Sequence, residues 1–215
     1  MDYVDLYQIH RWDWNTPIEE TLDALDSLVT SGKVRYLGAS NLAAWQLSKA
    51  LYLASESGWR RFISVQNQFN LVYREEEREM IPLCLDQSLA MLPWSPLARG
   101  FLTGSRHRDG GDTVRAKNDN FAREMYFTEE DFAVADAVAA VAADRGVKPA
   151  QVACAWVLQA PGVAAPIVGV TRLEQLQELI RAVDLTLSAE EIARVEAPYR
   201  PHRVLGRLGP PRRVR

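Results

Sequence analysis

The run Trp94-Ser95-Pro96-Leu97-Ala98-Arg99-Gly100 is the part of the sequence whose residue types best suit ligand binding. It follows an apolar stretch, 89–93, that is typical of a short buried strand bounded by turn residues. A tryptophan at a strand's carboxyl end offers a flat ring to a planar ligand, and a turn of small residues can present backbone N–H groups to an anion. The alternative is a tryptophan that caps a core beside an ordinary Ser-Pro turn, and this run alone does not decide between the two.

Polar or small residues also end the other expected strands. They are His10, Ser40, Asn41, Gln66, Asn67 and the run 169–171. If the strands are parallel, these residues lie on one rim of the sheet and face a common centre, as in the active site of a barrel. Structural roles remain open for several of them: a strand-end histidine at His10, a helix N-cap at Ser40 or Asn41, and a strand-end hydrogen bond at Gln66.

Strands and helices are expected to alternate along the chain and to position these residues. We expect strands over 3–9, 34–39, 62–66, 89–93 and 165–168, a helix that opens at 16–20 and stops at Gly32, helices over 43–56 and 74–86, and further helices beginning near Thr128, Pro149, Arg172 and Ser188. Thr16 would cap the first helix, with Pro17 at its first position. The segment 105–126 is polar and is expected to be irregular.

Strands separated by helices require a parallel sheet, either open and doubly wound or closed into a barrel. No Gly-x-Gly-x-x-Gly follows a strand, as an open dinucleotide-binding fold would require. The rim of polar residues favours an α/β fold of the (βα)8 TIM-barrel type. Only five strands are expected, and each βα unit takes roughly 30 residues. We therefore expect a truncated barrel of about five βα units with additional helices.

Composition indicates an ordinary globular chain. With 215 residues, 47% hydrophobic and 25% charged, the chain can bury a sizeable core. The net charge of −3 gives no general attraction to nucleic acid, so no nucleic-acid partner is expected. The arginines of 200–215 stand among proline and glycine, which predicts a basic, disordered tail after a barrel domain over 1–199.

The two cysteines, Cys84 and Cys154, each lie in an apolar helical pattern. This indicates buried, reduced thiols in a cytoplasmic protein, and neither a disulfide nor a metal site is expected. No signal peptide and no apolar run long enough for a membrane is found in the sequence, so no membrane partner is expected.

Four runs resemble the aldo-keto reductase family in order and in spacing: 2–10, 32–41, 94–100 and 166–172. The resemblance extends from Asp2 to about Pro198 and is greatest for bacterial reductases grouped with the potassium-channel β-subunits. It implies a (βα)8 barrel, of which this chain holds strands 4–8. It also implies an enzyme that binds NADPH extended across the rim and reduces a small-molecule aldehyde or ketone by hydride transfer.

The resemblance assigns roles at the nicotinamide end of the cofactor. His10 matches the active-site histidine that orients and polarises the substrate carbonyl. Ser40, Asn41 and Gln66 match side chains that hold the nicotinamide carboxamide, for which amide donors and acceptors are suited. Trp94 matches an aromatic residue that stacks on the nicotinamide ring.

At the phosphate end, Ser95, Leu97 and Ala98 would present backbone N–H groups to the pyrophosphate. Residues Gly169, Thr171 and Arg172 open a helix whose N-terminus favours negative charge. Arg172 suits a 2′-phosphate, because a guanidinium can bind two oxygens at once, so NADPH is expected rather than NADH. Gln175 and Glu178 would face the adenine, with a solvated helix face as the alternative. Leu179 departs from the family, which commonly has Asn there.

The family's general acid is a tyrosine supported by a lysine and an aspartate, all from its first three βα units. The resemblance begins after these units, so we expect this chain to be catalytically impaired. A non-catalytic NADPH-binding pseudoenzyme or a channel-subunit-like partner protein is the alternative, and an unrelated phosphate-binding barrel enzyme is a third. The edges of an incomplete barrel, at 3–9 and 165–168, also predict self-association.

Overall fold

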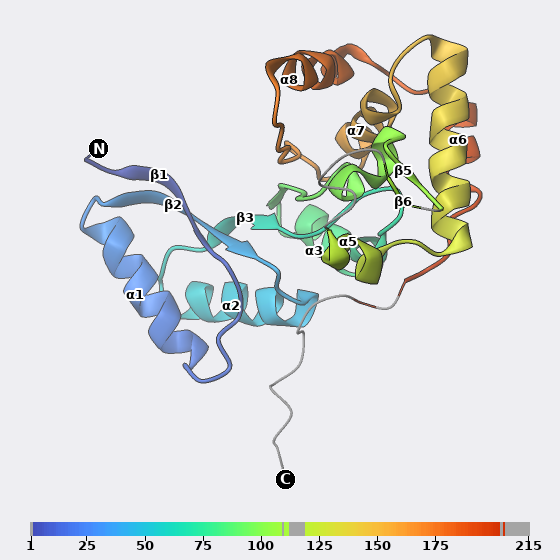
Figure 1. Cartoon of the computed structure of the whole chain (residues 1–215). Coiled ribbons are helices and arrows are strands. Elements are labelled where there is room, and N and C mark those ends of the chain that lie inside the picture. The colour runs from blue at the N-terminus through green and yellow to red at the C-terminus, as the bar shows by residue number, and fades with distance from the viewer. Residues whose placement is uncertain (1, 109, 112–118, 203, 205–215) are drawn as a thin grey trace. The chain divides into compact units, whose positions relative to one another are not determined.

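The computed structural model describes residues 2–108, 110–111, 119–202 and 204, which form two compact units (Figure 1). The first unit holds residues 2–67 and 76–92. The second holds residues 68–75 and the described residues from 93 onward.

The first unit is built on a parallel four-stranded sheet in the order β1-β2-β3-β4. The strands are β1 (Val4–Ile9), β2 (Val34–Ser40), β3 (Phe62–Gln66) and β4 (Ala90–Met91). Helices connect them as expected: α1 (Ile18–Thr30), α2 (Ala44–Glu56) and, after the short 3-10 helix η1 (Glu75–Glu77), α3 (Met80–Asp86). This order of elements confirms the α/β class with a parallel sheet.

The core of the first unit lies between the sheet and its helices, α1 and α2, which run along the sheet in Figure 1. Its fully buried side chains include Leu22 of α1, Leu47 of α2, Leu37 of β2, and Phe62 and Val65 of β3. The apolar residues of α1 recur at helical spacing, so one stripe of the helix is buried and its acidic residues stay in solvent.

Gly38 allows β1, β2 and β3 to approach closely. A Cβ atom at this position would lie 2.6 Å from Ser64 Oγ and 2.7 Å from Gln8 Cγ. The register between β2 and β3 shifts at Leu37/Gly38, which leaves Ile63 as an extra residue in β3. The sheet therefore brings the side chains of Gln8 and Ser64 together over a glycine.

The second unit is mainly helical, with α5 (Asn120–Met125), α6 (Glu129–Arg145), α7 (Pro149–Gln159), α8 (Leu173–Ile180) and α9 (Ala189–Glu196). It also contains the 3-10 helices η2 (Ala98–Thr103) and η3 (Arg181–Asp184) and a short antiparallel pair, β5 (Arg106–His107) and β6 (Gly110–Gly111). Helix α7 contacts α6, α8, η2 and η3, and every residue from 151 to 157 is buried. It is the central helix of this unit.

The helices expected near Thr128, Pro149, Arg172 and Ser188 are confirmed. The continuous helix expected over 74–86 is wrong, because the helix starts again at Met80. This restart puts Pro82 in the first turn of α3, where its missing N–H is harmless; in a continuous helix its ring would clash with the carbonyl of residue 78.

Three further local predictions need correction. The strand expected over 165–168 is reduced to one bridge between Ile167 and Trp94, because Pro166 has no N–H to extend the ladder. Thr16 does not cap α1, since its hydroxyl donates to Asp13 Oδ2 at 2.6 Å. The segment 105–126, expected to be irregular, contains β5, β6 and α5.

Most of the tail predicted over 200–215 lies outside the described residues. Of its described part, His202 is in contact with Asp131 and Glu75. Within the described chain, no helix combines the length and the apolar character needed to cross a membrane.

Candidate functional site

In the first unit, the carboxyl ends of three neighbouring strands are tied together by hydrogen bonds. Asn41 Nδ2 donates to the His10 carbonyl at 3.2 Å and to Ser40 Oγ at 2.8 Å. The Ser40 hydroxyl donates to the Gln66 carbonyl at 2.7 Å, and the Asn41 N–H donates to the same carbonyl at 3.2 Å. The four residues predicted from strand ends, His10, Ser40, Asn41 and Gln66, are thus brought together.

Neither Ser40 nor Asn41 caps the following helix. The N-cap of α2 is Ala43, whose N–H donates to Gln46 Oε1 at 2.9 Å. Asn41 is in the left-handed region, with φ 53°, where Asn is among the residues tolerated best. The helix-cap alternative for these two residues is therefore wrong.

The Gln66 side chain is the member of this cluster best placed to bind a ligand. Its amide makes no hydrogen bond to any described residue, and the residue is partly exposed. A primary amide can accept one hydrogen bond and donate another to a carboxamide, so this donor set fits a nicotinamide. His10 is exposed at the end of β1. The Ser40 hydroxyl hydrogen is committed to the Gln66 carbonyl.

In the second unit, Trp94 joins three chain segments. It pairs in parallel bridges with Gln68 and with Ile167, and Ile167 N donates to the Pro93 carbonyl at 2.7 Å. The backbone then turns sharply: Ser95, Ala98 and Arg99 have φ values of 56°, 46° and 54°. Non-glycine residues in this region are costly, and such strain is often found at ligand-binding turns.

One expectation about this turn needs correction. We expected Ala98 to offer its N–H to a pyrophosphate, but this N–H donates to the Ser95 carbonyl at 2.9 Å. The turn is closed by its own backbone, and Gly100 N continues it with a bond to the Leu97 carbonyl at 2.9 Å. Leu97 packs its side chain against the cluster of Cys154, Leu179 and Ala182.

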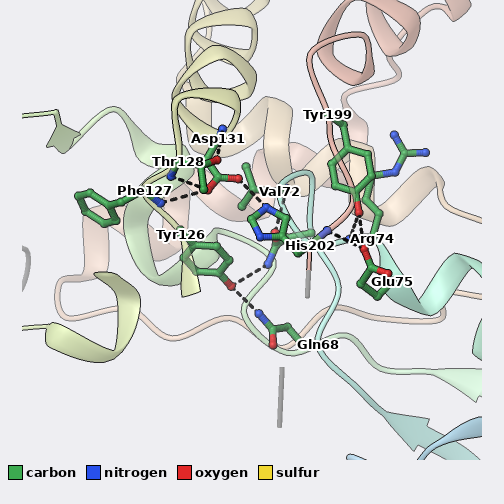
Figure 2. Close-up of polar contacts among 11 residues, drawn as sticks. Gln68, Val72, Arg74, Glu75, Tyr126, Phe127, Thr128, Asp131, Tyr199 and His202 are labelled. Carbon is green, nitrogen blue, oxygen red and sulfur yellow. Dashed lines mark hydrogen bonds and ion pairs between the residues drawn. The ribbon is translucent and has the colours of Figure 1, made fainter. Parts of the chain in front are cut away.

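A buried polar network beside this turn was missed in the sequence (Figure 2). Asn70 donates to the Ser95 carbonyl at 3.0 Å and to the Tyr126 hydroxyl at 3.2 Å, and Gln68 Nε2 donates to the same hydroxyl at 2.6 Å. Burial raises the pKa of Tyr126 to about 12, so the phenol stays protonated at neutral pH. The only sequence signal is Gln68 just before the apolar run 69–73 and Asn70 inside it, because the partners are far away in the chain.

The start of α8 carries the residues expected at the phosphate end. Arg172 is its N-cap residue, is exposed, and makes no ion pair with any described residue. Thr171 donates both its N–H and its hydroxyl to Gln175 Oε1, at 3.0 and 3.2 Å. The Gln175 side-chain oxygen is therefore committed to Thr171, just before the helix, and is not free for an adenine. Gly169 is exposed, and Glu178 is partly exposed.

Leu179, which departs from the family pattern, is a core residue. It is buried in the cluster with Cys154 and Ala182. An apolar side chain fits this position, whereas an unpaired amide there would be costly. Cys84 and Cys154 are both free and buried, as predicted, and desolvation raises the pKa of their thiols to about 12 and about 11.

The sequence of this chain matches the family model described as "Aldo/keto reductase family" over residues 1–200. The chain belongs to the aldo/keto reductase family. Its parallel βα units are accordingly part of that family's (βα)8 barrel.

Several curated proteins are similar to the chain. A versiconal hemiacetal acetate reductase of Aspergillus parasiticus is 44% identical over 93% of this chain and 58% of its own length. An aldo-keto reductase of Alternaria alternata is 41% identical over 93% of this chain and 53% of its own length. Norsolorinic acid reductase B of Aspergillus parasiticus is 37% identical over 92% and 51%. The chain thus spans little more than half the length of these relatives.

Proposed function

We propose that this chain binds NADPH and derives from an enzyme that reduces small-molecule aldehydes or ketones. The single observation that carries the proposal is the tied cluster of strand ends, in which the Gln66 amide stays open beside Asn41 and His10. The match to the aldo/keto reductase family supports the proposal, because the roles given to these residues are those that the resemblance to this family implies. On the same motifs, we also propose that the chain groups with the channel-β-subunit-like reductases of this family.

Each unit contributes its own residues to the proposal. In the first unit, Gln66 holds the nicotinamide carboxamide, with Ser40 and Asn41 fixing the strand ends around it. In the second unit, Trp94 stacks on the nicotinamide ring and Arg172 binds the 2′-phosphate through its guanidinium. Further contacts at the phosphate end come from Ser95, Leu97, Gly169, Thr171 and Glu178.

A bound NADPH would supply the hydride, and His10 would orient the carbonyl that accepts it. Its exposed ring stands at the end of β1, and the Asn41 side chain holds the His10 carbonyl at 3.2 Å. This fixes the backbone from which the imidazole extends. A neutral imidazole N–H can donate to a carbonyl oxygen, which is the polarising role that the resemblance assigns to this residue.

Cofactor binding is tested by titrating the full chain with NADPH and recording tryptophan fluorescence. Quenching that saturates, and that is largely lost in Trp94→Phe, would support the proposal. The chain has 6 tryptophans, so Trp45→Phe serves as a matched control that should leave the quenching in place. No saturable quenching, with no binding by calorimetry, would refute it.

Catalysis by this chain alone is a separate question. The resemblance places the general acid and its two partners before the matched motifs, so we propose that the 215-residue chain does not reduce 4-nitrobenzaldehyde above background. A missing positioned acid typically costs about two to four orders of magnitude in rate. Turnover comparable to that of a family member of full length would contradict this and point to another proton donor, with His10→Gln as the first variant to test.

Binding without turnover would favour the second candidate function, a non-catalytic NADPH-binding protein. The observation behind it is the same absence of the Tyr-Lys-Asp set from the motifs that match. The two candidates differ in one measurement: both bind NADPH, and only the enzyme consumes it with an aldehyde.

A further inference from the structure

The turn after Trp94 is held from outside as well as by its own backbone. Ser95, Ala98 and Arg99 all have left-handed backbone conformations, which L residues adopt only when their surroundings require it. The Ser95 carbonyl closes the turn by accepting the Ala98 N–H at 2.9 Å. Whatever fixes this carbonyl therefore fixes the turn.

Asn70 is the side chain that fixes it. The residue is 0% exposed, and its Nδ2 lies 3.0 Å from the Ser95 carbonyl oxygen. Its Oδ1 accepts the Val72 N–H at 3.0 Å, and its backbone exchanges hydrogen bonds with Tyr73. The amide is thus held at both ends and cannot rotate away without leaving buried groups unpaired.

Tyr126 completes the arrangement from another part of the chain, as Figure 2 shows. Its hydroxyl accepts the second amide hydrogen of Asn70 at 3.2 Å and the amide of Gln68 at 2.6 Å. Gln68 in turn lies opposite Trp94 in a parallel bridge. The side chains of Gln68, Tyr126 and Asn70 therefore link the segment that pairs with Trp94 to the Ser95 carbonyl.

We propose that Asn70 is a positioning residue for the cofactor turn, which it holds by donating a hydrogen bond to the Ser95 carbonyl while Tyr126 and Gln68 hold Asn70. The proposal rests on the proposed function, in which this turn receives the pyrophosphate of NADPH. Asn70 itself does not touch the cofactor in this scheme. It sets the backbone of the turn, in which Ser95 and Leu97 are the residues that contact the cofactor.

The test compares Asn70→Asp with the wild-type chain. The replacement has nearly the same shape, but its ionised carboxylate has no hydrogen to donate and repels the Ser95 carbonyl. Gln159→Glu is the matched control. The Gln159 side chain also donates to a backbone carbonyl and accepts from a backbone N–H, both of Leu187, and it makes these bonds outside the turn. At about pH 8, where carboxyl groups are ionised, amide hydrogen exchange is measured without any cofactor.

We expect exchange at Ala98 and Gly100 to become roughly 10-fold or more faster in Asn70→Asp, with α7 unchanged. Equal exchange in the turn of both proteins would overturn the proposal. An equal increase throughout the second unit would also overturn it, because Asn70 would then be only a core residue. If Asn70→Asp does not fold, Tyr126→Phe, which keeps the Asn70 bond to Ser95, should show a smaller increase confined to the same turn.

NADPH binding gives the second readout. The affinity should fall roughly 10- to 100-fold in Asn70→Asp at about pH 8. It should recover toward the wild-type value as the pH is lowered, because burial raises the pKa of the introduced carboxyl and favours its protonated form. The introduced carboxyl, once protonated, can donate to the Ser95 carbonyl again, which a general packing defect would not reproduce. If the wild-type chain does not bind NADPH, the proposed function is contradicted. Faster exchange of the turn in Asn70→Asp would still support the positioning role of Asn70.

Discussion

His202 Nε2 lies 2.7 Å from Asp131 Oδ1, although the two residues are 71 positions apart in the chain. Asp131 Oδ2 accepts the N–H groups of Phe127 and Thr128 at the start of α6. The backbone N–H of His202 donates to Glu75 Oε1, which also accepts a hydrogen bond from the Tyr199 hydroxyl (Figure 2). The segment that follows α9 is therefore fastened to the start of α6 and to the start of η1.

This contact makes the stability of the second unit depend on pH. The hydrogen bond to Asp131 raises the pKa of His202 above its ordinary value of 6.5, with Glu75 and Glu130 adding to the effect. A raised pKa in the folded state means that the stabilisation is complete below about pH 6.5 and is lost as the pH rises through the folded value. We expect His202→Ala to cost about 1–2 kcal/mol below about pH 6.5 and less at higher pH.

Urea unfolding of both proteins between about pH 5.5 and 8.5 measures this difference. His10→Gln removes another histidine without touching Asp131 and should give a difference that does not follow the same pH profile. A His202→Ala difference that stays constant or grows with pH would contradict the prediction.

Gly38 has no room for a side chain. We expect Gly38→Ala to destabilise the first unit by about 1–3 kcal/mol, because its methyl group would lie 2.6 Å from Ser64 Oγ. Gly169→Ala is the matched control, since no atom lies within 4 Å of its Cβ position. Ser64→Ala in the same chain should recover part of the loss. Equal midpoints for the two glycine variants in urea would show that the sheet relaxes at no cost.

Arg172 should distinguish the two dinucleotides. We expect Arg172→Ala to weaken NADPH by about 10- to 100-fold and NADH much less, because only NADPH carries the 2′-phosphate. Arg181→Ala, at the other end of α8, should change neither affinity. Calorimetric titration with both dinucleotides checks this, and equal losses for the two would show that Arg172 does not bind the 2′-phosphate.

The outer strand of the sheet should promote self-association. β1 is an edge strand, and Tyr3, just before it, and Tyr7 within it are 39% and 43% exposed. Unpaired edges with apolar side chains are templates for pairing with another chain. We expect oligomers by size-exclusion chromatography with light scattering, and a shift toward monomer in Tyr7→Lys. Tyr52→Lys, on the exposed face of α2, is the control that should leave the distribution unchanged.

The second edge that we expected, at 165–168, is not a strand in this structure. A monodisperse wild-type monomer would mean that the edge of β1 is protected and would contradict the prediction of self-association.

Local patterns were sufficient for much of the fold. The alternation of strands with helices predicted the parallel sheet, and the positions expected for α1, α2, α6 and α7 agree with the structure to within a few residues. The motifs at strand ends predicted the cluster of His10, Asn41 and Gln66, because parallel strands bring their carboxyl ends to one edge. Local signals failed where a proline interrupts a pattern, as at Pro82 and Pro166.

By itself, the sequence determined the class of the sheet, the family and the residues that stand at the strand ends, because these depend on patterns and motifs within short stretches. Only the tertiary structure decided which polar groups meet. Asn70 is hydrogen-bonded to Ser95, 25 positions away, and to Tyr126, 56 positions away, whereas the Ala98 N–H is hydrogen-bonded within the turn. Such pairings follow from the need to satisfy buried polar groups after the chain has packed, and no local pattern specifies which partner will be there.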